Sequence, residues 1–457
     1  MSEHVNVLRQ SRRAFLKVAG VASAGITAIG GFSAVPAVHA AGSDVIKVGL
    51  VGCGGRGMGS LLDRLKVADN VKVVALGDID KARAEKGMEA LSKMADIKGK
   101  VDLTPDCLFG GFDNHKKVTE LVDVVLINSP PGFHPDHYLY AVEKGKHVFM
   151  EKPFGVDAEG YRRCMKANKI AEEKGLTVCA GFMRRYDNKY VEWISRIRNG
   201  MIGDVVSTRV YWNCAAAKDR GAWVEGETEM SFQAHCWYVF NWLSGDHIVE
   251  QHCHNLDTGN WIHGKGDPLA HPVSCVGVGG RQTRKTPKFP IHICGHIFDH
   301  HYVEFRYADG STMHSTCRQV PNCWNKITEA VDGTKGNGET GWLQPVGGER
   351  WEYPRRNQDG SPYVQEHIAQ AEAMRQGKKL HDGWSAATST MIGVMGRMAT
   401  YSGKEIKWDD AVARGKTLFP YNVELTFNTV PPVTLGPDGT YEHAVPIPGV
   451  YDPFDQS

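Results

Sequence analysis

The 457-residue sequence lacks several features that would place it in a specialised class of protein. It has no long run of like charges, no low-complexity tract and no repeat of fixed period, which argues against disordered tails and solenoids. Its 53 basic and 52 acidic side chains nearly cancel, so nothing favours nucleic acid or an anionic membrane as a partner. Hydrophobic residues make up 42% of the chain, which is ordinary for a globular protein with a large core.

The 11 cysteines are scattered singly, and no Cys-x-x-Cys pair occurs. This spacing argues against a structural zinc site of the usual kind. The odd count in so long a chain also argues against a disulfide framework. We therefore expect free thiols.

The first 41 residues have the features of a targeting signal. Arg12 and Arg13, followed by Phe-Leu-Lys, resemble the twin-arginine export motif; a mildly apolar run covers residues 18–35, and small side chains follow at 37–41. We expect residues 1–41 to be a signal peptide that directs the folded protein to the periplasm, with no stable membrane insertion after cleavage. The apolar run is slightly short for a membrane span, but retention as an uncleaved anchor stays open.

Residues 42–182 alternate between short apolar runs and segments with helical spacing. The expected strands cover residues 46–51, 71–76, 122–127, 147–150 and 177–180, and the expected helices cover 58–68, 81–95, 137–143 and 157–174. This alternation predicts an α/β domain with right-handed crossovers and a parallel sheet, as in a Rossmann fold.

The pattern changes after this region. Two alternating runs at 302–307 and 312–318 flank an Asp-Gly turn, which is a reliable hairpin signal. Residues 335–362, rich in glycine, proline and asparagine, read as a long surface segment. We expect residues 183–430 to form an α+β domain with an open, largely antiparallel sheet, and 431–457 to be a C-terminal tail.

A glycine-rich turn follows the first expected strand. Residues 52–57 read Gly-Cys-Gly-Gly-Arg-Gly, in which Gly52 permits a tight turn, Gly54 lets a pyrophosphate approach and Gly57 packs helix against strand. Asp78, at the end of the second strand, is placed to bind a ribose 2′-hydroxyl and to repel a 2′-phosphate. These features predict NAD rather than NADP as cofactor, although the nearby Arg83 can soften the preference.

Three further segments suggest a family. Ser-Pro-Pro-Gly-Phe-His at 129–134, Glu-Lys-Pro at 151–153 and the stretch 250–257 together resemble the glucose–fructose oxidoreductase / inositol dehydrogenase (Gfo/Idh/MocA) superfamily, over about residues 46–420. The resemblance implies that Lys152 lies near the nicotinamide and hydrogen-bonds the reacting hydroxyl, with a pKa lowered by partial burial. The expected cofactor contacts are Gly52, Gly54, Gly55, Arg56, Gly57, Asp78, Ser129, Pro130, His134, Glu151 and Lys152.

The second-domain signature of this superfamily maps onto Glu250, His254 and Asp257, although Asp is commoner than Glu at the first position. On one helix, His247, Glu250, Gln251 and His254 would form a polar stripe. We expect His254 to be the general base and Glu250 to orient it or share its proton. We assign no metal ligand, although His247, Glu250 and His254 could instead hold zinc.

The function expected from this resemblance is oxidation of a sugar hydroxyl by NAD. A redox-neutral glycosidase or lyase that oxidises its sugar only transiently is the alternative, and a non-catalytic sugar-binding module is a third possibility. A homodimer or homotetramer built through the open sheet is expected, since such a face needs a partner. The expected substrate contacts are Arg184, Arg185, Tyr186, His235 and Asp257.

Overall fold

The computed structural model describes residues 45–67, 70–215, 225–283, 295–354, 356 and 359–456. The expected signal peptide, residues 1–41, lies outside the described residues. Within the described part, no helix is both long and apolar enough to cross a membrane, and the cysteines are all free thiols.

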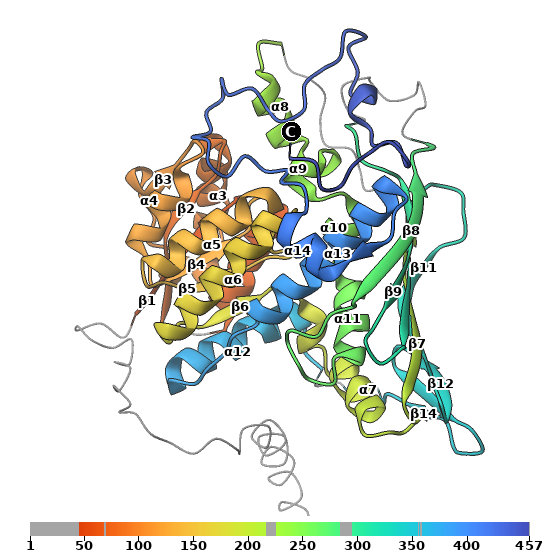
Figure 1. Ribbon diagram of the computed structural model, residues 1–457. Helices are drawn as coiled ribbons and strands as arrows, with labels where there is room; N and C mark the ends of the chain where they lie inside the picture. Colours follow the sequence, from red (N-terminus) through yellow and green to blue (C-terminus); the bar gives the residue numbers. More distant parts are fainter. Residues whose placement is uncertain are drawn as a thin grey trace, which may run out of the picture. The chain divides into compact units, whose positions relative to one another are not determined.

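The first half of this part contains a six-stranded parallel sheet, drawn in red to yellow in Figure 1. Its strand order is β3-β2-β1-β4-β5-β6, which is the order of a Rossmann fold. The strands are β1 (Ile46–Val51), β2 (Val71–Gly77), β3 (Leu108–Phe109), β4 (Val124–Ile127), β5 (His147–Met150) and β6 (Val178–Ala180). Every residue of β4, β5 and β6 is buried, as expected for strands covered on both faces. The predicted parallel α/β domain is confirmed.

Five helices accompany this sheet: α2 (Gly55–Lys66), α3 (Lys81–Ser92), α4 (Asn114–Leu121), α5 (His134–Glu143) and α6 (Ala158–Glu173). Helix α2 begins three residues earlier than predicted, because the glycine turn itself forms its first turn. Side chains cap two of the others: Asp80 accepts a hydrogen bond from the amide of Ala82, and Asp157 accepts one from Gly160.

The second half of the chain builds a nine-stranded sheet in the order β14-β13-β12-β11-β7-β10-β9-β8-β15. Strand β10 runs parallel to β7, and the other neighbours are antiparallel, so the predicted largely antiparallel sheet is confirmed. The strands are β7 (Val205–Cys214), β8 (Ser274–Gly280), β9 (His300–Arg306), β10 (Thr312–Gln319), β11 (Lys326–Gly333), β12 (Gly336–Glu339), β13 (Trp342–Pro345), β14 (Trp351–Glu352) and β15 (Ile406–Lys407).

Helices cover one face of this sheet, between it and the Rossmann domain (Figure 1). The helices of this half are α7 (Asn188–Arg198), α8 (Glu229–His235), α9 (Asn241–Ser244), α10 (His247–Glu250), α11 (Cys253–His263), α12 (Pro362–Gln376), α13 (Gly383–Ser402) and α14 (Trp408–Arg414). Of these, α11 and α13 make the broad contacts with the sheet, whereas α12 packs against α2 and β6 of the Rossmann domain. Helix α13 is buried along nearly its whole length. Its Met391 and Met395 share an apolar cluster with Ile248, Val303 and Phe305, so α13 joins the sheet to the segment that carries the expected catalytic residues.

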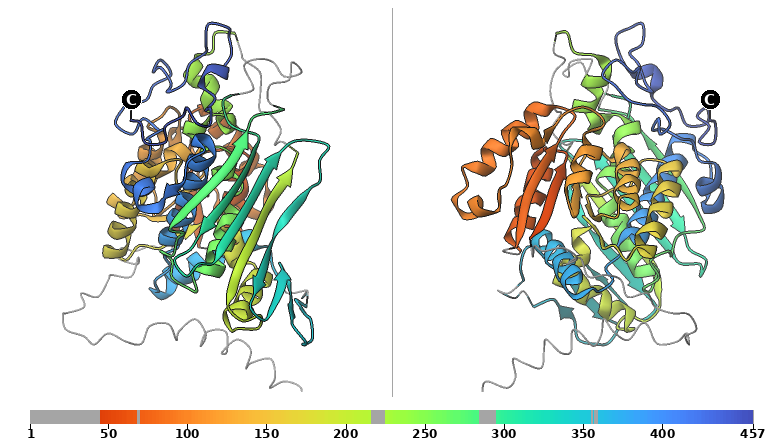
Figure 2. Two further views of the ribbon diagram at one scale, coloured as in Figure 1. Left: turned by 45° about the vertical axis from the view of Figure 1, so that its right-hand side comes forward. Right: turned by 90° about the vertical axis from the view of Figure 1, so that its left-hand side faces the viewer.

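The other face of the sheet carries no helix, as the left view of Figure 2 shows. Strands β8 and β9 present there the exposed side chains of Val278 and Tyr302, which are cross-strand neighbours. A broad sheet face of this kind is a common self-association surface, and self-association through it stays a prediction.

Residues 335–362 differ from the sequence-based expectation, because they contain β12, β13 and β14 as well as surface turns. The pattern missed them because a Gly-Asn-Gly-Glu strand has no alternation of apolar and polar residues. Glycine is needed there for another reason: a Cβ on Gly336 would lie 2.5 Å from the carbonyl oxygen of Gln344 on the neighbouring strand. Close backbone approach at β12, together with the burial of Leu343 in β13, defines this edge.

A buried ion pair ties the second domain together. Arg184 follows the last Rossmann strand and pairs with Glu329 of β11, whose side chain is fully buried. The same carboxylate accepts hydrogen bonds from Tyr190 at 3.1 Å, Asn255 at 2.5 Å and Thr340 at 2.7 Å. Removing the cation leaves a buried carboxylate without its main counter-charge.

We therefore expect Arg184→Met to lower the free energy of unfolding by about 3–5 kcal/mol, the usual cost of breaking a buried pair from one side. Urea unfolding followed by far-UV circular dichroism measures this change. The matched control is Arg306→Met, because Arg306 and its partner Glu304 form an exposed pair whose loss costs about 0–1 kcal/mol. Equal unfolding midpoints for the two variants would contradict the structural role of Arg184.

Candidate active site

A cleft of about 430 Å³ opens at the carboxyl ends of the Rossmann strands and is lined by both domains. The Rossmann side contributes Gly52, Gly54, Gly55, Arg56, Gly57, Asp78, Arg83, Asn128, Ser129, Pro130 and Lys152. The second domain contributes Trp212, His235, Trp237, Tyr238, Glu250, Gln251 and His254. This edge of a parallel sheet is where ligands of α/β proteins bind.

The glycine turn fits a dinucleotide pyrophosphate. A Cβ placed on Gly54 or Gly55 would meet no atom within 4 Å, so the backbone there is open to the cleft. Gly52 has φ +95°, and a Cβ on Gly57 would lie only 1.9 Å from the carbonyl oxygen of Gly52, so both positions require glycine. Beside the turn, both side-chain amide atoms of Asn128 are buried without a hydrogen-bond partner in the described structure. Such groups call for a polar ligand.

Asp78 is fixed at the end of β2 by two backbone hydrogen bonds. Its carboxylate accepts one from the amide of Cys53 at 2.8 Å and another from the amide of Asp80 at 3.0 Å. Burial raises the pKa of Asp78, and these hydrogen bonds act in the opposite direction. The carboxylate therefore braces the glycine turn and also lines the cleft, as its predicted contact with a ribose requires.

Arg56, which belongs to the glycine turn, is held in place by two acidic side chains and a tyrosine ring. Its Nε donates to Glu151 at 2.5 Å, its Nη2 donates to Glu366 of α12 at 3.4 Å, and its guanidinium lies 4.4 Å from the ring centre of Tyr363. His134 is likewise internal, with its ring nitrogens 2.6 Å from the carbonyl oxygens of Ser129 and Pro153. Glu151 and His134 thus support the loops that form the cleft.

Lys152, the second residue after β5, reaches across to the second domain. Its Nζ donates to the carbonyl oxygen of Glu250 at 2.7 Å and to the Glu250 carboxylate at 3.2 Å. Burial is the largest single effect on the pKa of Lys152 and acts to lower it, but Glu250, Cys253 and Glu151 together outweigh burial, and the pKa is raised. The expected lowering of this pKa is therefore wrong: Lys152 is held as an ammonium, because its closest neighbour is an anion rather than another donor.

His254, near the start of α11, faces the same cleft in an apolar setting. Its ring lies parallel to Trp212, with ring centres 6.1 Å apart, and edge-on to Phe182. Burial, followed by the positive charges of Lys152 and Arg184, holds the pKa of His254 well below its ordinary value. The imidazole is therefore neutral at neutral pH and able to accept a proton.

The predicted polar stripe is not carried by one helix. Helix α10 ends at Glu250, a turn follows, and α11 begins at Cys253. Glu250, Gln251 and His254 line the cleft, but His247 lies instead beside Asp246 and His301. The break therefore separates His247 from Glu250 and His254, the other two zinc ligands considered in the sequence analysis. Among the described residues, the cluster that could hold a metal is Asp246, His247 and His301 instead.

Of the five expected substrate contacts, His235 lines the cleft. The others are engaged in buried contacts: Arg184 with Glu329, Arg185 with Asp257 at 2.7 Å, and the Tyr186 hydroxyl with Asp382 at 2.5 Å. Their substrate roles stay predictions. The sequence reasoning missed Asn128, Trp212, Trp237 and Tyr238 as cleft residues. Asn128 alone had a signal, since it directly follows a buried Rossmann strand.

Comparison with known proteins agrees with this geometry. Residues 46–182 match the Gfo/Idh/MocA family, described as an oxidoreductase family with an NAD-binding Rossmann fold. An inositol 2-dehydrogenase of Burkholderia cenocepacia (strain HI2424) is 33% identical over 266 residues, which are 58% of this chain and 65% of that protein. The inositol 2-dehydrogenase of Agrobacterium fabrum is 35% identical over 146 residues, 32% of this chain and 39% of the relative. The matches thus span less than two thirds of these relatives.

Solved structures share the fold over most of the chain. Scyllo-inositol dehydrogenase from Lactobacillus casei, with bound NAD(H) and scyllo-inositol, aligns with a TM-score of 0.59 at 18% identity, over 80% of this chain and 99% of that one. Aldose-aldose oxidoreductase from Caulobacter crescentus aligns with a TM-score of 0.60 at 16% identity, over 79% of this chain and 99% of that one. The two-domain fold is therefore shared, and residues 46–182 match the NAD-binding Rossmann fold of that oxidoreductase family.

Proposed function

We propose that the protein is an NAD(H)-dependent oxidoreductase that acts on a hydroxyl group of a sugar or sugar derivative. One observation carries this proposal: Lys152 from the Rossmann domain and His254 from the second domain line the same cleft as the glycine turn and Asp78. A hydroxyl between these two groups would lie next to the cofactor, where hydride transfer needs it.

The two side chains have complementary protonation states. Lys152 is an ammonium and can donate a hydrogen bond to the oxygen of the reacting hydroxyl. His254 is a neutral imidazole and can take the proton that this hydroxyl loses. NAD, when bound, would accept the hydride from the carbon that carries this hydroxyl. Glu250 holds Lys152 in place rather than contacting His254, which differs from the orienting role first expected for it.

Two features support a sugar or polyol as the substrate. The second-domain wall of the cleft carries Trp212, Trp237 and Tyr238, whose flat faces suit the apolar faces of sugar rings. The relatives at about one-third identity are named inositol dehydrogenases, which act on a ring polyol.

Lys152→Met and His254→Ala should each lower kcat/KM for the true substrate by ~100- to 10,000-fold, the usual contribution of a positioned acid–base group. Both variants should still bind NAD, because neither residue belongs to the glycine turn. Steady-state kinetics on a panel of sugars and polyols, with NADH absorbance as the signal and NAD titration in parallel, measure both effects.

The matched controls are Lys144→Met, at an exposed position, and His314→Ala, which lies beside Tyr302 on the helix-free face of β10; both should keep normal kcat/KM. Near-normal activity of His254→Ala would refute its role as the base. Cleavage of a glycoside without net formation of NADH would contradict the proposed net oxidation and favour the redox-neutral glycosidase or lyase.

The loss of kcat/KM on the acidic side of the pH–rate profile should occur below the ordinary histidine pKa of about 6.5. Because the pKa of His254 is lowered, its imidazole stays neutral as the pH falls through 6.5 and is protonated, with loss of activity, only at lower pH. A pH–rate profile tests this, and an acid limb centred at or above the ordinary value would contradict it.

Gly54→Ala should weaken NAD binding by about tenfold or more, ~1.4 kcal/mol, and leave stability unchanged. The added methyl group enters open space in the cleft, where the pyrophosphate is expected, and meets no protein atom. Calorimetric titration and thermal unfolding measure the two properties. Gly57→Ala is the contrasting variant, because its methyl group collides with the backbone and should also lower the melting temperature. NAD affinity unchanged in Gly54→Ala would contradict the placement of the cofactor.

A further inference from the structure

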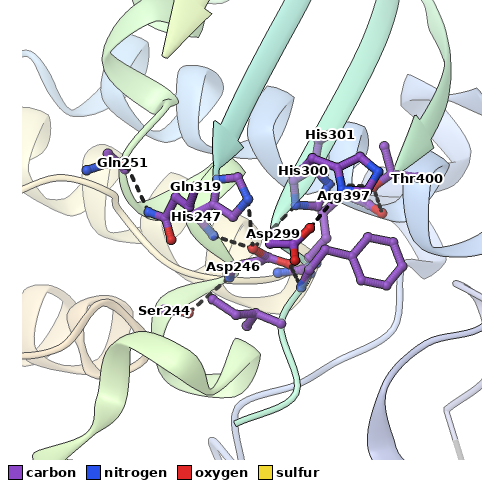
Figure 3. Close-up of polar contacts among 12 residues, drawn as sticks. Ser244, Asp246, His247, Gln251, Asp299, His300, His301, Gln319, Arg397 and Thr400 are labelled. Carbon is purple, nitrogen blue, oxygen red and sulfur yellow. Dashed lines mark hydrogen bonds and ion pairs between the residues drawn. The ribbon is translucent and has the colours of Figure 1, made fainter. Parts of the chain in front are cut away.

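A second cluster of polar side chains lies outside the cleft, between α10, β9 and α13. Asp246 precedes α10, His247 is its first residue, and His301 belongs to β9; all three are buried (Figure 3). None of them lines the cleft, and the mechanism above gives them no task.

Hydrogen bonds determine which nitrogen of His301 carries a proton. The hydroxyl of Thr400 donates its only hydrogen to the carbonyl oxygen of Arg397 at 3.0 Å. Thr400 must therefore accept from Nδ1 of His301, which lies 2.9 Å away. In neutral His301 this leaves Nε2 with a free lone pair, and Nε2 is buried without a hydrogen-bond partner in the described structure.

That lone pair faces an anion. Nε2 of His301 lies 3.4 Å from Oδ1 of Asp246, and Nε2 of His247 lies 3.9 Å from the same oxygen. A lone pair directed at a carboxylate oxygen is repulsive unless a positive charge lies between them. A direct charged hydrogen bond would bring the two atoms to about 2.7–2.9 Å, whereas two ligands of one tetrahedral zinc ion, with bonds of ~2.0–2.1 Å, lie roughly 3.3 Å apart.

Two hydrogen bonds fix the orientation of the Asp246 carboxylate. Its Oδ2 accepts hydrogen bonds from the Tyr401 hydroxyl at 2.5 Å and from the amide of Phe298 at 2.9 Å, which turns Oδ1 toward the two histidines. Asp246 also has φ 71° and ψ 163°, a backbone region otherwise limited to glycine that is found at ligand-holding positions. Outer hydrogen bonds of this kind, including that of Thr400, are what orient the ligands of metal sites.

We propose that Asp246, His247 and His301 form a buried binding site for one divalent transition-metal ion. Three ligand atoms, one from each side chain, lie within 4.8 Å of one another. Two imidazoles and a carboxylate suit Zn²⁺, and Fe²⁺ accepts the same set. The ion would fasten the start of α10 to β9, three residues before Glu250, and so act as a structural anchor for the catalytic wall.

Elemental analysis of the purified full-length protein by mass spectrometry tests this site without relying on activity. We expect one equivalent of zinc per chain, loss of the metal in His301→Gln, and retention of the metal in the control His300→Gln, because His300 is the adjacent half-exposed residue of β9. Iron in place of zinc would keep the site and overturn the choice of metal.

A second measurement covers the case in which His301→Gln fails to fold. After removal of the metal by a chelator, the melting temperature of the wild-type protein should fall, and Zn²⁺ alone should restore it. Added Co²⁺ should give the visible absorption bands of a tetrahedral site. No transition metal above background together with no Zn²⁺-dependent or Co²⁺-dependent change would overturn the proposal and leave a His301–Asp246 ion pair. Metal content unchanged in a folded His301→Gln would overturn it as well.

Discussion

The contact between Lys152 and Glu250 joins the two domains across the cleft, and the chemistry of the site depends on it. It connects the second residue after a Rossmann strand to the last residue of α10, through a carbonyl oxygen and a carboxylate. The carbonyl contact fixes backbone as well as side chain, so the start of α11, and with it His254, is held at a set distance from the glycine turn. A cleft between two domains becomes an active site only when its two walls are held in register in this way.

The same contact distributes charge within the cleft. Glu250 keeps Lys152 protonated, and the positive charge of Lys152, after burial, helps to keep His254 neutral. An ammonium and a neutral imidazole thus coexist in one small volume, with the Glu250 carboxylate supplying compensating negative charge. Glu250, at a position where the resemblance makes Asp the commoner residue, contacts the lysine through both its carboxylate and its backbone carbonyl. Environment, rather than residue type alone, assigns the two roles.

Local pattern predicted most of the fold. The apolar runs gave five of the six Rossmann strands, and the Asp-Gly turn gave the hairpin of β9 and β10, because burial and turn chemistry leave a periodic trace in the sequence. Strands β12 to β14 left no such trace, since backbone pairing and close glycine approach define them. The glycine turn and Lys152 were identifiable by motif, whereas Trp212, Trp237 and Tyr238 reach the cleft through long-range packing that no local spacing encodes. Arg185 and Asp257 show the converse case: each resembled a substrate contact, and the fold pairs them with each other.

The break between α10 and α11 explains why the region from 246 to 254 misled a reading by helical spacing. On one continuous helix His247 and His254 would share a face, and both could serve one site. The structure turns the chain at Gln251 and His252, so that His247 joins Asp246 and His301 on the side of the sheet while Glu250 and His254 face the cofactor cleft. Gln251 connects this turn to the sheet, because its side-chain oxygen accepts a hydrogen bond from Gln319 of β10 at 3.0 Å. A short helix that is fixed at its start by a buried polar cluster and at its end by Lys152 has little freedom left. Because Glu250 lies on this helix, the position of the Lys152 ammonium depends on both domains at once.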